Sequence, residues 1–275
     1  MGKTKVLFIS QEIAPYLPKS PLSELGINLA RTSQEKGYEV RTFMPKYGCI
    51  NERRNQLHEV IRLSGMNLII DDTDHPLIIK VATLQPSRMQ VYFIDSDDYF
   101  HFSPDKKLET VTDPEENDER QMFFVRGVIE TVKKLRWEPA VIYCMGWISA
   151  LAPLYLKRMF QDDPSLANTK IVFDLRPESF DGTLDERFAE KLTMSQFEAE
   201  DIASVTGKPV DTKALTKLAI DYADALVQSS PEVDSEIIEY AASSGKPFLR
   251  YNHELESEAD MVPNIIDFYQ QLIKD

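Results

Sequence analysis

The sequence has few cysteines and no long apolar run. Its 275 residues include two cysteines, Cys49 and Cys144, which is too few for a disulfide-stapled secreted domain and is typical of a reduced, cytoplasmic protein. Apolar runs such as residues 6–9 and 68–70 are far shorter than the roughly 20 residues that a membrane-spanning helix needs. We therefore expect a cytoplasmic protein with no membrane partner.

Basic charge is also scarce. The chain has 31 lysines and arginines against 45 aspartates and glutamates, which gives a formal net charge of −14. Proteins that bind DNA or RNA neutralise phosphates with clustered lysine and arginine side chains, and no such basic face is evident in this sequence. We therefore expect no nucleic-acid partner.

Histidine is rare, and its spacing is not that of a metal site. The four histidines, His58, His75, His101 and His253, are scattered rather than placed at the short intervals that zinc ligands show. No serine lies in the G-x-S-x-G turn of a hydrolase nucleophile. We predict neither a metal site nor a bound cofactor.

Extended apolar segments alternate with helical periodicity through most of the chain. This alternation is typical of βαβ units, so we predict an α/β fold with a mostly parallel, Rossmann-like sheet and helices on both faces. The predicted strands lie near residues 4–10, 38–44, 89–95, 140–144, 170–175 and 224–229. The predicted main helices lie near residues 22–36 and 118–137.

Two segments depart from this alternation. Residues 57–84 contain short apolar segments separated by turn residues at 64–65 and 71–74, which predicts an antiparallel hairpin extension. Residues 262–275 carry apolar side chains at helical spacing, which predicts an amphipathic helix at the end of the chain.

The turn after the first predicted strand has no glycine. In doubly wound α/β proteins this turn binds phosphate through backbone N–H groups, and glycine allows the backbone to approach the ligand closely. Here residues 17–22 read LPKSPL, and each proline removes a backbone donor. We therefore expect a loop that has lost much of a phosphate-binding cradle.

Five segments, in the right order, resemble the bacterial starch and glycogen synthases. They match the family's opening strand and S-x-E-[VI]-A-P-[FY] turn, its M-P-[KR]-Y-G strand end, its D-N-x-x-R-F-x-x-F segment, its W-x-T-A-L-x-P-x-Y-L-K helix entry and its Y-A-D-x-V-x-T-V-S-P segment. The matching residues are 5–16, 37–48, 118–124, 147–157 and 222–231. The resemblance implies a retaining glucosyltransferase of GT-B fold, which transfers glucose from ADP-glucose to an α-1,4-glucan.

The resemblance also implies a domain organisation. It covers the chain to about residue 248, so residues 1–275 are expected to form one starch or glycogen synthase N-terminal-like domain, with 262–275 as a closing C-terminal helix. The chain resembles a short, single-domain branch of the family. In two-domain members the second Rossmann-like domain binds most of the nucleotide sugar, and we expect it to be absent here.

The departures from the family's motifs bear on activity. Residues 18–21 read PKSP where the family has K-T-G-G, and Lys19 is one place out of register with the family's lysine. In the H-x-H-D-W motif Tyr143 replaces the first histidine, and residues 145–146 (MG) replace the second histidine and the aspartate. Residues 174–177 read DLRP where the family has T-I-H-N. Because methionine cannot carry a proton as imidazole does, we expect a pseudoenzyme that is catalytically incomplete alone.

The expected role is that of a binding or regulatory protein of glucan metabolism. Its expected partners are an α-glucan or ADP-glucose and a partner glycosyltransferase. No residue is assigned a catalytic role, and the candidate ligand-cleft residues are Glu12, Lys19, Lys46, Trp147 and Arg176. Two alternatives stay open: an active glucosyltransferase that needs a partner chain, and a nucleotide- or sugar-phosphate-binding module that uses Lys19 and Lys46.

Overall fold

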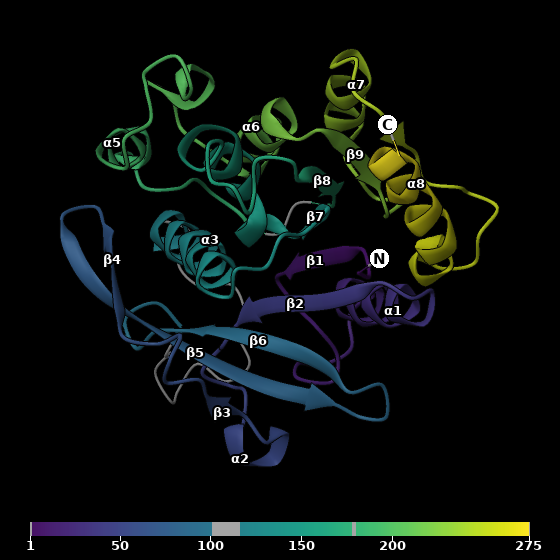
Figure 1. Ribbon diagram of the computed structural model, residues 1–275. Helices are drawn as coiled ribbons and strands as arrows, with labels where there is room; N and C mark the ends of the chain where they lie inside the picture. The colour runs from purple at the N-terminus through teal and green to yellow at the C-terminus, as the bar shows by residue number, and fades with distance from the viewer. Residues whose placement is uncertain (1, 101–115, 178–179, 275) are drawn as a thin grey trace.

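The protein is a twisted sheet flanked by helices on both faces (Figure 1). The computed structural model describes residues 2–100, 116–177 and 180–274. The strands are β1 (Lys5–Ser10), β2 (Glu39–Pro45), β3 (His58–Glu59), β4 (Met66–Ile70), β5 (Thr73–Leu84), β6 (Met89–Asp95), β7 (Val141–Met145), β8 (Lys170–Leu175), β9 (Ala225–Gln228) and β10 (Phe248–Leu249).

The helices follow the parallel strands. The α-helices are α1 (Pro21–Glu35), α2 (Glu52–Asn55), α3 (Asn117–Lys134), α4 (Ala152–Leu154), α5 (Phe188–Met194), α6 (Thr212–Tyr222), α7 (Ser235–Ser243) and α8 (Val262–Lys274). The short helical turns are η2 (Trp147–Ser149), η3 (Tyr155–Met159), η4 (Ala203–Val205) and η5 (Glu258–Met261). All six predicted strands and both predicted main helices are present.

The order of the strands reverses beside β1. The sheet runs β10-β9-β8-β7-β1-β2-β6-β5-β3, and every pair from β10 to β6 is parallel. The predicted fold class, with a mostly parallel sheet between helices, is confirmed. The parallel strands end at one edge, here called the carboxyl edge, and the reversal between β1 and β7 marks the point where ligands of open α/β sheets bind.

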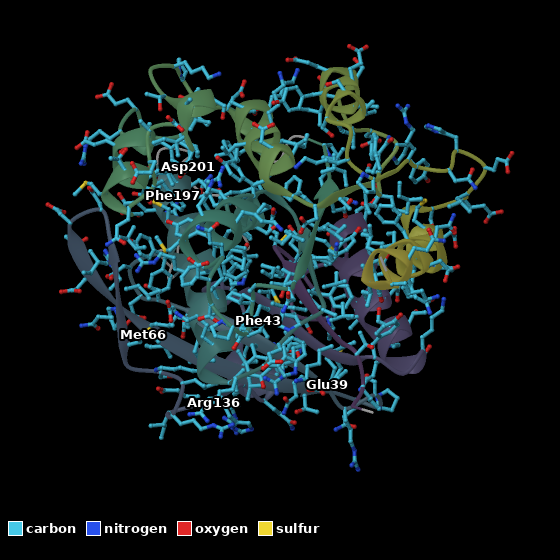
Figure 2. All side chains as sticks on the ribbon, turned by 45° about the horizontal axis from the view of Figure 1, so that its top comes forward. Glu39, Phe43, Met66, Arg136, Phe197 and Asp201 are labelled. Atoms are coloured by element: carbon cyan, nitrogen blue, oxygen red, sulfur yellow. The ribbon has the colours of Figure 1, made fainter. Side chains whose placement is uncertain are left out.

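The parallel strands are apolar because helices cover them on both sides. The four residues from Val6 to Ile9 on β1 and all five of β7 are at most 1 % exposed. Phe43 on β2 lies in the side-chain interior, where its ring stacks on that of Tyr92 with centroids 4.9 Å apart (Figure 2). Burial of these side chains from water is the main stabilisation of the domain.

The predicted antiparallel extension is also confirmed, with one correction. β5 pairs antiparallel with β4, β3 and β6, and its hairpin with β4 projects beyond the parallel strands (Figure 1). The turn is shorter than the predicted residues 71–74, because Thr73 already pairs with Ile70. Asp71 has φ of 55°, so the chain reverses within two residues, as left-handed backbone at a hairpin turn allows.

The helix predicted at the end of the chain is α8, and it lies beside α1 (Figure 1). Tyr269 is fully buried, and its hydroxyl is 2.7 Å from the Ser33 hydroxyl on α1. Near the end of α1, the Lys36 ammonium is 3.1 Å from the Asp267 carboxylate. Because α1 follows β1, it begins at the carboxyl edge and ends at the opposite edge. Tyr269 and Asp267 contact the end of α1, so the beginning of α8 and the preceding η5 lie toward the carboxyl edge.

Candidate functional site

The candidate site lies at the carboxyl edge, where the chain leaves β1, β7 and β8. Gln11, Gly146 and Arg176 follow these three neighbouring strands. This placement comes from the strand order, since β1 and β7 flank the reversal and β8 is next to β7. The residues at this edge determine whether a ligand has room to bind.

The Gln11 side chain fills the space above Gly146. The Gln11 backbone N–H donates to the Met145 carbonyl at 3.0 Å, which continues the pairing of β1 with β7. Gly146 has φ of +84°, and a Cβ atom there would lie 2.7 Å from both Cβ and Oε1 of Gln11. The structure therefore has no room for a side chain at the position that corresponds to the family's aspartate.

The two residues at the histidine positions are buried. Tyr143 and Met145 are both 0 % exposed, so neither presents a group at the surface of the edge. Burial raises the pKa of Tyr143 well above its ordinary value, so this phenol stays neutral. Neither side chain can gain and lose a proton near neutral pH as an imidazole does, because the phenol keeps its proton and a thioether has none.

The loop that corresponds to the family's glycine-rich turn leads directly into the beginning of α1. Ser20 caps α1, since its hydroxyl oxygen accepts from the Ser23 backbone N–H at 3.0 Å. The same hydroxyl donates to Glu12 Oε2 at 2.6 Å. Through this hydrogen bond Glu12, a predicted cleft residue that follows β1, holds the loop before α1 against the end of β1.

The two predicted lysines lie in different surroundings. Lys19 is exposed and forms an ion pair with Glu24 at 2.9 Å. Lys46 is 3 % exposed, and its ammonium is 3.0 Å from Glu52, whose carboxylate also pairs with Lys80 at 2.6 Å. Lys46 is therefore already part of a buried charge network, while Lys19 points into solvent.

Trp147 and Arg176 are the predicted residues that the structure brings together. Both line a small cavity of about 30 Å³, together with Asp174 and residues of α6. Trp147 is 6 % exposed, and its ring meets that of Phe180 edge to face at 5.4 Å. The cavity has the volume of about one water molecule, so as it stands it holds no sugar ring.

Arg176 is the centre of a hydrogen-bonded network. Its Nη1 donates to Ser229 Oγ at 2.8 Å and to Glu258 Oε2 at 2.7 Å. Ser229 Oγ in turn donates to Asp174 Oδ2 at 2.8 Å. The pKa of Asp174 is raised to about 7, mainly by burial and to a smaller extent by the charge of Glu258, while Arg176 and Ser229 act in the opposite direction.

Sequence reasoning missed three members of this network. Asp174 and Ser229 lie in segments that resemble family motifs, so the sequence indicated that both are at strand ends but not that they join Arg176 in one network. Glu258 is 82 residues from Arg176, and no local pattern points to the contact.

Another buried cation, Lys191, lies in a separate charged cluster. The Lys191 ammonium, 2 % exposed, is within 2.7–3.0 Å of the carboxylates of Asp118, Glu119 and Asp185. Burial raises the pKa of Asp118 to about 6, although Lys191 favours its ionised form. Among the described residues no group of histidine, cysteine and acidic side chains has the arrangement of a metal site.

Comparisons with known proteins agree on one family. The family model described as starch synthase catalytic domain matches residues 5–250. The chain is 32 % identical over 231 residues to a glycogen synthase of Chlorobium chlorochromatii, covering 83 % of this chain and 46 % of the relative. It is 31 % identical over 239 residues to a glycogen synthase of Chlorobium phaeovibrioides, covering 85 % and 47 %. The chain thus spans about half the length of the curated relatives it matches.

A solved structure shows the same fold. The catalytic domain of starch synthase IV from Arabidopsis thaliana, bound to ADP and acarbose, superposes with a TM-score of 0.72 at 17 % identity, covering 94 % of this chain and 53 % of that one. None of the helices in the described part of this chain is long and apolar enough to cross a membrane.

Proposed function

The chain belongs to the starch synthase catalytic domain family, as its motifs predict, and from this premise we propose that it serves glucan metabolism by binding or regulation. In this proposal the domain does not by itself transfer glucose from ADP-glucose to an α-1,4-glucan. Its ligand is an α-glucan or ADP-glucose, and its protein partner is a glycosyltransferase. Residues 1–275 act as one synthase-like domain, with 262–275 as its closing helix.

The occupied carboxyl edge carries this proposal. Gln11 fills the place above Gly146, and Glu258 pairs with Arg176. Glucosyl transfer from a nucleotide sugar needs hydrogen-bond donors and positive charge that stabilise the leaving diphosphate and the developing charge on the sugar. At this edge Arg176 Nη1 donates to both Ser229 and Glu258, and the histidine positions hold buried side chains.

A transfer assay tests the absence of activity. The purified chain is incubated with radiolabelled ADP-glucose and glycogen, next to an active glycogen synthase as the positive control. We expect no incorporation above the protein-free blank. Label in the glycogen fraction at a rate proportional to the concentration of this chain would contradict the proposal.

Binding is tested separately from transfer. The solved relative was bound to ADP and acarbose, which supports testing a nucleotide and an oligosaccharide. Native electrophoresis through gels that contain glycogen reports glucan binding as retardation, with bovine serum albumin as the unretarded control. Mobility equal to that of albumin at every glycogen concentration would remove the α-glucan from the proposal.

The alternative of an active enzyme that needs a partner chain rests on the length of the relatives. Since the chain spans about half of each, a second chain could supply the remaining half. Label would then enter glycogen only when both proteins are present. We also propose a cytoplasmic location, which the free thiols of Cys49 and Cys144 support because a reducing compartment keeps such thiols free.

A further inference from the structure

The side of the sheet farthest from β10 carries a basic surface. β3 ends the strand order on that side, and β2, β6 and β5 separate it from β1 and so from the candidate site. α2, β3 and the turn after them lie together there, and residues 52–63 are here called the β3 surface (Figure 1). The chain as a whole is strongly acidic, yet residues 53–62 contain three arginines and one glutamate. The charge of the β3 surface is therefore opposite to that of the whole chain.

The three arginines of the β3 surface are exposed. Arg53 and Arg54 lie on α2, and Arg62 lies in the turn after β3. Within the described ranges no carboxylate forms an ion pair with any of them. Glu52, the acid of α2, is engaged with two lysines at 3.0 and 2.6 Å. The planar donors of these guanidinium groups are therefore available to carboxylates from outside the chain.

An exposed apolar side chain lies among these arginines. Ile61, next to Arg62, is 83 % exposed, the most of any large apolar side chain that the structure describes. The Val60 N–H donates to the Ile79 carbonyl on β5, so by the alternation of an antiparallel pair the backbone N–H and C=O of Glu59 face away from β5. Arginine around an apolar centre is typical of protein interfaces. The β3 surface thus offers an extended segment charge, apolar contact and one backbone donor and acceptor.

The charge of the β3 surface favours one kind of partner. A positive surface on a protein of net charge −14 attracts anions locally, while the rest of the chain repels an extended polyanion. Anionic membranes are bound by clusters of about four to eight basic residues, and the β3 surface has three arginines. A short acidic segment of a protein can meet this positive charge without meeting the acidic remainder, which favours it over a membrane or a nucleic acid.

We propose that the β3 surface binds an acidic, extended segment of a partner protein. Carboxylates of that segment pair with Arg53, Arg54 and Arg62, and an apolar side chain between them packs on Ile61. This inference goes beyond the proposed function, because the surface lies three strands away from β1 and recognises a peptide rather than a glucan or a nucleotide sugar.

Fluorescence anisotropy with a labelled peptide of alternating glutamate and leucine tests the surface. We expect this peptide to bind the wild-type chain more tightly than a peptide of alternating glutamate and serine, which lacks the apolar contact. In Arg53→Gln/Arg54→Gln/Arg62→Gln the affinity for the glutamate–leucine peptide should fall about tenfold, since each exposed ion pair contributes modestly and three are lost. Because the three side chains are exposed, the melting temperature of this variant should equal that of the wild-type chain.

Matched controls separate the β3 surface from charge and apolar surface in general. The variant Arg31→Gln/Arg88→Gln/Lys208→Gln removes the same number of positive charges from exposed positions on other elements, and it should bind the peptide as the wild-type chain does. Ile61→Thr should weaken binding roughly fivefold, the loss expected when an isoleucine is partly buried on binding. Ile69→Thr on β4, where the isoleucine is 57 % exposed, should leave the affinity unchanged.

Three outcomes would overturn the proposal. The first is equal peptide affinity in the two triple variants, which would show that the arginines of the β3 surface have no special part. The second is binding of the wild-type chain to phosphatidylserine vesicles but not to the peptide, which would assign the surface to a membrane. The third is self-association of the arginine variant, measured by ultracentrifugation, with no peptide binding by the wild-type chain. The arginines would then only keep the edge of β3 from pairing with another copy. None of these outcomes depends on glucosyl transfer, so the proposed function is tested separately.

Discussion

Two buried cations of this domain are neutralised in different ways. Lys191 is surrounded by three carboxylates, from Asp118 and Glu119 on α3 and from Asp185 just before α5. Arg176 has Glu258 as its direct ion-pair partner, from a stretch with no buried side chain before Met261. The first arrangement ties the beginning of α3 to α5, whereas the second joins the ends of β8 and β9 to η5 through one ion pair and the hydrogen bond to Ser229.

The two cations differ in the number of carboxylates that pair with each among the described residues. A buried charge that loses its partners is strongly destabilising, so a cation held by three acids on packed elements has little freedom to take a ligand. Within the part of the chain that the structure describes, Arg176 forms an ion pair with one acid, Glu258, so fewer charges lose their partner when this pair is broken.

The largest expected effect is at Lys191. Replacement of Lys191 by methionine keeps much of the side-chain volume but leaves three acids without their cation, so we expect a loss of about 3–5 kcal/mol of unfolding free energy. Thermal melting measures it, with Lys217→Met as the control, because Lys217 pairs with Glu236 at the surface. A loss in Lys191→Met no larger than that in Lys217→Met would show that the buried Lys191 contributes no more to stability than a lysine at the surface.

A smaller loss is expected at Glu258. The amide oxygen of glutamine still accepts a hydrogen bond from Arg176, so Glu258→Gln should cost about 1–2 kcal/mol, the difference between a charged and a neutral hydrogen bond. Urea denaturation of this variant beside Lys191→Met measures both losses on one scale. If Glu258→Gln proves the more destabilising of the two, Glu258 is a structural partner and the comparison above fails.

The network around Arg176 also predicts a pH dependence of stability. Burial raises the pKa of Asp174 to about 7, above the roughly 3.9 of an unfolded aspartate. Such a group binds more protons when folded, so its contribution to stability falls as pH rises from about 4 to about 7 and is constant above that range. The charge of Glu258 contributes to the raised pKa, so Glu258→Gln should lower it.

Urea denaturation at pH 5 and pH 7 tests this sign. We expect stability to fall less, or rise more, from pH 5 to pH 7 in Glu258→Gln than in the wild-type chain, while the control Asp267→Asn behaves as wild type. Contributions from groups that titrate outside this network are the same in the variant and in wild type, so they cancel in the comparison. A greater fall, or a smaller rise, in Glu258→Gln would mean that Glu258 does not raise the pKa of Asp174.

The fold and the site were predictable from sequence to different degrees. The strands and main helices follow from periodicity over a few residues, as on β1, where Val6 to Ile9 are buried from both sides. The turn at Asp71 was predicted too long because its left-handed backbone is not encoded by composition alone. A local sequence pattern is therefore enough to predict that a helix or strand forms, but not the exact residue at which it ends.

The site depends on contacts that no local pattern contains. Motif comparison located Arg176 and Trp147 at adjacent strand ends, and the structure places both at one cavity. It could not show that Lys46 is paired with Glu52, since this contact depends on where the folded chain places Glu52 of α2 relative to Lys46 and Lys80. The Glu258 contact joins segments 82 residues apart, so only the folded chain brings it into view.

The smallest effect is expected at Lys19. Lys19 is 81 % exposed in its side chain and pairs with Glu24 in solvent, so Lys19→Ala should change the melting temperature by no more than about 1 °C. A fall in melting temperature well beyond 1 °C in Lys19→Ala would show that Lys19 contributes more to stability than a solvent-exposed pair with Glu24 does.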